Sequence, residues 1–192
     1  MKDILSDLIK KIQLYSGSYE NLNLIEGMKE EAVKKLEEEW DVEFPNDLRI
    51  TLKYWGKTVI DPKYKNLILT VPHYGEMGLT SESQLRTVYQ LLMASDYQQK
   101  TKHDCKGISE EFLWNPKWIP VAAYGNHSIH DRLSLYDLIV LDERSALYQK
   151  VVHWSYRSGV VRIVADSFED YISHFYNDLD CMSWDGTYGF SF

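Results

Sequence analysis

Apolar residues in the first quarter of the chain recur at helical spacing. Such spacing predicts an amphipathic helix over residues 4–12 and a second helix over residues 28–40. The second helix would place one apolar stripe on a core and show an acidic face to water. Pro45 is well placed to begin a third helix, with Asp47 favourable in its first turn and Gly56 a natural C-terminal stop.

The spacing of apolar residues then changes from helical to strand-like. Residues 66–71 form an apolar, β-branched run typical of a strand, and a capping-box pattern at Ser81 predicts a helix that continues to Leu92. Residues 94–107 lack either period and are expected to be a loop. Short strand-like runs follow at residues 119–122, 133–135, 137–142, 151–154 and 160–164. Because the intervals between them leave no room for crossover helices, the pairing is expected to be antiparallel.

Ser167 is expected to cap a last helix, whose apolar face extends to Leu179. The tail over residues 181–192 fits no regular element. Helices first, a meander of strands and a closing helix together predict an α+β fold, with helices packed on a single antiparallel sheet. We find no internal repeat and no linker, so residues 1–192 are expected to form one domain.

Charge changes this picture by favouring one kind of partner. The chain carries 21 Lys and Arg against 29 Asp and Glu, a formal net charge of −8. Nucleic acid and anionic membranes both require a basic surface, so neither is an expected partner. Acid gathers between Glu26 and Asp47, and no Lys or Arg follows Arg162. Such a surface either keeps the protein soluble or steers a basic partner protein.

The location is expected to be cytoplasmic. Cys105 and Cys181 are the two cysteines, too few for a disulfide framework or a four-ligand zinc site. The N-terminal residues interrupt their apolar positions with charges, which is unlike a signal peptide, and no stretch has the length of a membrane span.

Candidate chemistry is sparse. His127 and His130 stand three residues apart in a predicted turn, which departs from the helical four-residue spacing of metalloproteases and offers no third ligand. Cys105 follows His103 closely, but nothing nearby would lower the pKa of its thiol. Asp137 and Asp142 would point to opposite faces of one strand. We therefore predict no catalytic residues, no metal site and no cofactor.

Three segments together carry a family resemblance. The first spans residues 32–56, with a Leu36-Glu37 step in a helix, a Phe44-Pro45 pair and a short helix that ends near Gly56. The second is the strand Trp118-Ile119-Pro120-Val121-Ala122. The third joins Val152-His153-Trp154 to Ala165-Asp166-Ser167-Phe168-Glu169, at the entry to the last helix. The run over residues 137–142 also fits the family's pattern, although Tyr136 stands where that family usually has a Gly.

Over about residues 25–177 the chain resembles the SUKH (SMI/KNR-like) superfamily, in which bacterial toxin-immunity proteins and fungal cell-wall regulators occur. The resemblance implies helices on a strongly curved antiparallel sheet, with loops that form a partner-binding cleft, and it implies no catalysis. Pro45, Trp118, Trp154 and Ser167 are expected to have structural roles. The N-terminal helix and the C-terminal tail would be extensions of this core.

The leading hypothesis is an immunity protein that binds and covers a cognate toxin domain, plausibly a basic nuclease. The alternatives are an intracellular regulatory scaffold of the SMI/KNR type and a metal-dependent hydrolase that uses His127 and His130. The oligomeric state is left open. The candidate partner-binding residues combine the acidic helix with aromatic loops and one strand: Glu37, Glu38, Glu39, Tyr74, Glu76, Tyr124 and Asp137.

Overall fold

The order of elements is helices, four strands and a helix, as the hydrophobic pattern predicts. The computed structural model describes residues 3–7, 10, 27–54, 82–94, 115–124, 135–155, 161–178, 183–184 and 190–191. Its elements are α2 (Glu30–Trp40), α3 (Asn46–Tyr54), α4 (Glu82–Met93), β1 (Trp118–Tyr124), β2 (Leu135–Val140), β3 (Val151–Ser155), β4 (Val161–Ala165), α6 (Phe168–Asp178), β5 (Ser183–Trp184) and β6 (Phe190–Ser191). The α+β prediction is confirmed.

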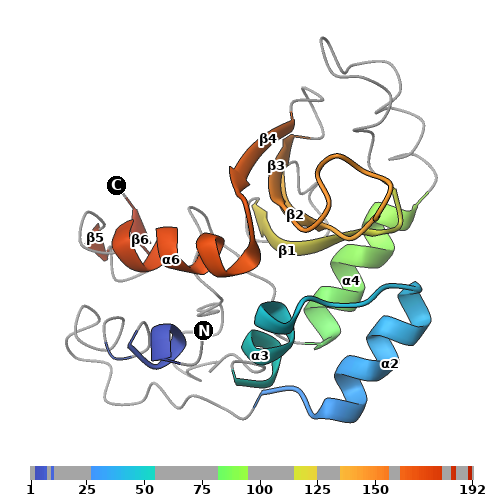
Figure 1. Cartoon of the computed structure of the whole chain (residues 1–192), viewed down its shortest axis with the longest axis horizontal. Helices are drawn as coiled ribbons and strands as arrows, with labels where there is room; N and C mark the ends of the chain where they lie inside the picture. Colours follow the sequence, from blue (N-terminus) through green and yellow to red (C-terminus); the bar gives the residue numbers. More distant parts are fainter. Residues whose placement is uncertain are drawn as a thin grey trace.

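Strands β1 to β4 form one sheet in chain order, and each neighbouring pair is antiparallel. The register shifts between Pro120 and Ala122 in β1, and again between Val151 and Val152 in β3. Such irregularities bend strands and increase their twist. The sheet is visibly curved in Figure 1, as the family resemblance implies.

One strand prediction was wrong. The runs over residues 133–135 and 137–142 were expected to be separate strands, but β2 continues from Leu135 to Val140. The aromatic residue between them, Tyr136, is fully buried and lies opposite Trp154 of β3, with 5.5 Å between the stacked ring centroids. A buried aromatic pair stabilises neighbouring strands, so Tyr136 joins the two runs.

The core lies between the helices and the sheet. Helix α4 packs against β1, α6 packs against β4, and α3 contacts both α2 and α6, an arrangement that Figure 1 shows. Trp118 and Trp154 are among the largest fully buried side chains, which confirms their expected structural role. Trp40 of α2 stacks on Tyr89 of α4 with 4.1 Å between ring centroids, and this contact joins the two helices.

Three residues fix where helices α3 and α6 begin. Pro45 directly precedes α3, and its carbonyl accepts the backbone N–H of Arg49 at 3.0 Å. Ser167 precedes α6, and its Oγ accepts the N–H of Asp170 at 3.0 Å, so the predicted N-cap is confirmed. Asp47 serves both helices, because its Oδ1 accepts the N–H of Leu48 and its Oδ2 accepts the N–H of Glu169 of α6 at 2.8 Å.

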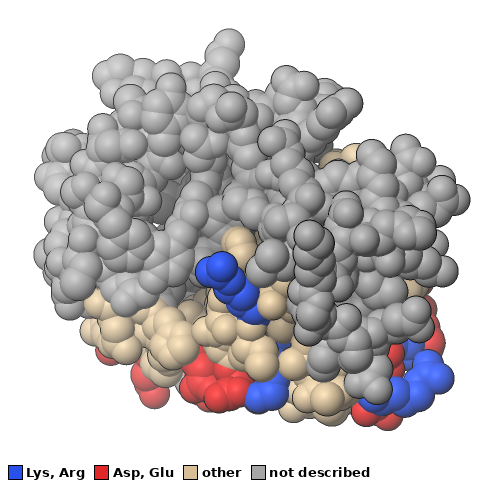
Figure 2. Space-filling model, turned by 90° about the horizontal axis from the view of Figure 1, so that it is seen from above, with Lys and Arg blue, Asp and Glu red and all other residues tan. Residues whose placement is uncertain are grey.

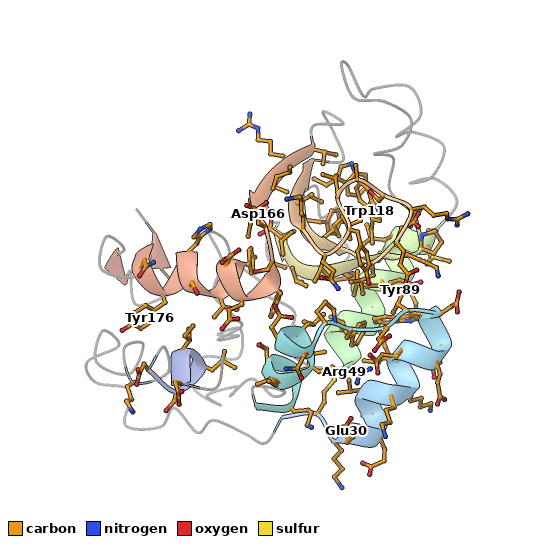
Figure 3. The ribbon with its side chains drawn as sticks, in the orientation of Figure 1. Glu30, Arg49, Tyr89, Trp118, Asp166 and Tyr176 are labelled. Carbon is orange, nitrogen blue, oxygen red and sulfur yellow. The ribbon has the colours of Figure 1, made fainter. Side chains whose placement is uncertain are left out.

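Helices α2 and α3 meet closely where α2 begins. The backbone N–H of Met28 donates to the carbonyl of Leu52 at 2.8 Å. A Cβ atom at Gly27 would lie 1.7 Å from the carbonyl oxygen of Lys53, so only glycine fits at this approach. Lys53 also forms an ion pair with Glu30, and Glu30 is labelled at the start of α2 in Figure 3.

The tail departs from its prediction. It was expected to be irregular, yet Ser183–Trp184 and Phe190–Ser191 pair as β5 and β6. Strands of two residues are too short to produce a readable alternation. At the other end, residues 3–7 and 10 are helical, as predicted, and Leu5 is buried. The predicted strand over residues 66–71 lies outside the described residues. Among those described, no helix has the length and apolar character to cross a membrane.

Candidate partner-binding groove

Three consecutive glutamates at the end of α2 have three different environments. Glu37 continues the buried stripe of Val33, Leu36 and Trp40 and is only 8 % exposed. Its Oε1 accepts the Nε–H of Arg49 at 2.9 Å and the backbone N–H of Phe44 at 2.6 Å. Arg49 comes from α3, and Figure 3 shows it between α2 and α3. The structure therefore places Glu37 inside the helical layer and not on the expected acidic face.

The other two glutamates are exposed on different sides of the helix. Glu39 forms ion pairs with Arg86 of α4 and, at 3.8 Å, with Lys35. The hydrogen bond from Arg86 lowers the pKa of Glu39 below its usual value. Glu38 lines an open groove. Only Glu38 of the three therefore combines exposure with a place beside a surface that could receive a partner.

The groove has a volume of about 560 Å³ and lies between two backbone segments. One wall is the connection between α2 and α3. The other is the loop that joins β2 to β3, which lies above that connection in Figure 1. Its lining consists of the side chains of Glu37, Glu38, Asp41, Val42, Glu43, Lys117, Leu141, Asp142, Glu143, Arg144 and Tyr148.

The groove is acidic in sum. Six carboxylates line it against two cations, a formal excess of four negative charges in the lining, or three when Arg49, the partner of Glu37, is counted. Both cations are engaged: the Lys117 Nζ lies 3.2 Å from Asp41, and the Arg144 Nε lies 3.6 Å from Asp142. Figure 2 shows a face on which acidic and basic side chains adjoin along the lower edge. The lining of the groove therefore carries its own local excess of acid.

The second wall is organised by Asp142, which follows β2. Its carboxylate accepts the backbone N–H of Arg144 at 3.1 Å and the side-chain amide of Asn115 at 3.3 Å. Its backbone carbonyl accepts the N–H of Ser145 at 2.9 Å. These bonds shape the β2–β3 loop, since Asx-type contacts to following N–H groups stabilise turns. Asp137 and Asp142 were expected to point to opposite faces of one strand, but β2 ends at Val140 and Asp142 lies in the loop that follows it.

Asp137 has an internal role. It is fully buried on β2, where its Oδ1 lies 2.8 Å from the His153 Nδ1 of β3 and its Oδ2 accepts the Tyr171 hydroxyl at 2.7 Å. Burial, the negative charge of Asp137 and this hydrogen bond raise the pKa of Tyr171 well above its usual value. Asp137 thus ties β2 to β3 and to α6, and its carboxylate does not reach the surface.

The remaining predicted site residues are not placed. Tyr74, Glu76, His127 and His130 lie outside the described residues, and for Tyr124 only the backbone, at the end of β1, is described. Within the part of the chain that is described, no three His, Cys, Asp or Glu side chains gather as a metal site would require.

Most residues of the groove could not be singled out from the sequence. Asp41 and Glu43 belong to the acidic run over residues 26–47, which was a usable signal. Lys117, Arg144 and Tyr148 carried none. Lys117 precedes β1 and the other two lie in the β2–β3 loop, and only the fold brings them beside the connection after α2.

A comparison with protein families supports the family resemblance that the sequence motifs indicated. The family model described as SMI1 / KNR4 family (SUKH-1) matches residues 27–174, close to the range of about 25–177 expected from the motifs. No individual curated protein matches the chain. The matched range extends from Gly27, at the approach of α2 to α3, into α6, and it includes both walls of the groove. The chain therefore belongs to the SMI1/KNR4 family, SUKH-1.

Proposed function

We propose that the protein is a non-catalytic immunity protein that acts in the cytoplasm and neutralises a cognate toxin by direct binding. Family membership supports a protein-binding role. The observation that carries the proposal is the open groove with its excess of four negative charges. An acidic surface attracts a basic partner and rejects a like-charged one, so it suits a toxin domain that itself binds an anionic substrate such as nucleic acid.

To neutralise the toxin in this way, the protein needs only to cover the toxin's active face. A stable protein–protein interface covers about 800 Å² on each partner. The groove and the exposed surface around it would supply the centre of such an interface. The toxin's active face would then be covered, and no bond would be made or broken by the immunity protein.

The test is co-expression with the cognate toxin domain, which this proposal expects a neighbouring gene to encode. Cells that carry the toxin domain alone should stop growing, and co-expression of the full chain should restore growth. A catalytically inactive toxin variant should co-purify with the chain in equal amounts. Undiminished killing, despite equal expression of both proteins, would contradict the proposal.

The second hypothesis is a regulatory scaffold of the same family type. It predicts no toxin gene in the neighbourhood and a growth or cell-wall phenotype on deletion. Gene order therefore separates the two hypotheses before any protein is purified.

A further inference from the structure

The groove is held open from within by hydrogen bonds that need no partner. On one wall, Glu37 contacts the following connection twice: its backbone carbonyl accepts the N–H of Val42 at 3.1 Å and its carboxylate accepts the N–H of Phe44. On the other wall, Asp142 holds its own loop. Lys117 joins the walls, because its carbonyl accepts the N–H of Leu141 at 2.8 Å and its Nζ contacts Asp41.

The charges that face solvent in this groove are a separate set. Among the described residues, Glu38 and Glu143 have no ion-pair partner, and the Glu43 carboxylate is 88 % exposed and 3.9 Å from Arg49. Tyr148 adds an aromatic ring that is 39 % exposed. The groove thus combines a pre-set shape with carboxylates that remain available and one ring that can cover an aliphatic or cationic side chain.

The distribution of these carboxylates favours one kind of ligand. A divalent cation requires oxygen ligands that converge on one point. No such convergence occurs among the described residues. An anionic ligand is disfavoured by the sign of the lining. Carboxylates spread along two walls instead match cations spread along a chain, as in an extended segment with several Lys or Arg side chains.

We infer that this groove is the docking site for a basic, extended segment of the partner protein, with Glu38, Glu43 and Glu143 as its contact carboxylates. The inference rests on the proposed function for the partner's identity. Glu37 and Asp142 act as positioning residues for the two walls. Because those walls are already bonded in the free protein, docking would not require them to become ordered.

The test uses a labelled nine-residue peptide of alternating Arg and Ser, and a matched peptide with Glu in place of Arg. In ¹⁵N-resolved NMR of the full chain, the Arg peptide should shift amide signals at residues 38–43, 117 and 141–148. The Glu peptide should not. The affinity should fall as salt is added, because exposed charges are screened. Shifts centred elsewhere on the protein would overturn the inference.

Matched triple variants sharpen this test. Glu38→Gln, Glu43→Gln and Glu143→Gln together should weaken the Arg peptide about tenfold, the sum expected of three exposed pairs. The control triple removes the same charge at exposed positions outside the groove, through Glu31→Gln, Glu169→Gln and Asp170→Asn, and should change binding less than twofold. Equal weakening by both triples would overturn the inference, since only total charge would then matter.

The same variants separate this inference from the proposed function. If the groove triple loses peptide binding but still rescues cells from the toxin domain as well as the wild type does, the docking site is wrong and the function stands. If the wild-type chain fails to rescue, the proposed function fails, whatever the peptide does. Loss of rescue in the groove triple alone would support both.

Discussion

Replacement of Glu37 by leucine should be far more destabilising than the same replacement of its neighbour Glu38. The residue is one of three consecutive glutamates, and nothing in its type distinguishes it from Glu38. Its carboxylate is nevertheless buried and accepts hydrogen bonds from the Arg49 side chain and the Phe44 backbone. Leucine has a similar volume and no acceptor, so the substitution removes these bonds without opening a large cavity.

The magnitude follows from the groups that lose their partner. A buried N–H left unpaired at Phe44 costs about 1–3 kcal/mol. Breaking a buried ion pair costs about 3–5 kcal/mol when the remaining charge is stranded. Arg49 is not stranded, because its side chain is 32 % exposed and also lies near Glu43. We therefore expect Glu37→Leu to lower the free energy of unfolding by about 2–4 kcal/mol, or the Tm by roughly 5–15 °C.

Glutamine and the neighbouring glutamate provide the controls. Glu37→Gln keeps an oxygen for the Phe44 N–H and loses only the charge opposite Arg49, so it should cost about 1 kcal/mol. Glu38→Leu changes an exposed side chain and should stay within about 0.5 kcal/mol of the wild type. Urea unfolding followed by circular dichroism measures all three variants, provided that the m-value is unchanged. If Glu37→Leu were no more destabilising than Glu38→Leu, the structural role assigned to Glu37 would be refuted.

Three further predictions concern pH, helix capping and salt. The raised pKa of Tyr171 means that its stabilising contribution is complete below about pH 10, where unfolded tyrosine titrates, and is lost as the pH rises through the higher folded value. Tyr171→Phe should flatten this alkaline loss in a pH series of urea unfolding. It should also cost about 1–3 kcal/mol at neutral pH, because it removes the hydroxyl that donates to the Asp137 Oδ2. A steep alkaline loss that persists in this variant would point to other groups. Ser167→Ala removes the acceptor for the Asp170 N–H and should lower the free energy of unfolding by about 1 kcal/mol, with no change measured if the cap has no energetic role. In stopped-flow mixing with the toxin domain, added salt should slow association steeply and leave dissociation nearly unchanged. A salt-independent association rate would mean that the acidic residues only keep the protein soluble and do not steer the partner.

Helix positions and caps were readable because they depend on local patterns. Ser167 and Pro45 act on backbone groups within a few residues of themselves, and so does the Oδ1 of Asp47. The bond from the Glu169 N–H to the Oδ2 of Asp47 depends on the fold and was not readable. Burial of Glu37 was also readable in principle, since it stands four residues after Val33 and three before Trp40 on the helical stripe. Its partner Arg49 was not, because that contact depends on how α3 folds back on α2.

The groove could not be predicted from the sequence for a related reason. Its two walls are about a hundred positions apart along the chain and are joined by Lys117, whose carbonyl and ammonium group contact one wall each. For Asp137 the error was the opposite one, because a buried residue was predicted to contact a partner at the surface. Its charge suggested a surface contact, whereas His153 and Tyr171, from two other elements, satisfy it inside the protein.

Isothermal titration of the full chain with a catalytically inactive variant of the proposed cognate toxin domain tests the central claim most directly. The account predicts one-to-one binding with a Kd below about 1 µM, which corresponds to about −8 kcal/mol. The groove triple should bind at least about tenfold more weakly, and the control triple should bind as the wild type does. Absence of measurable binding by the folded wild-type chain would contradict the account.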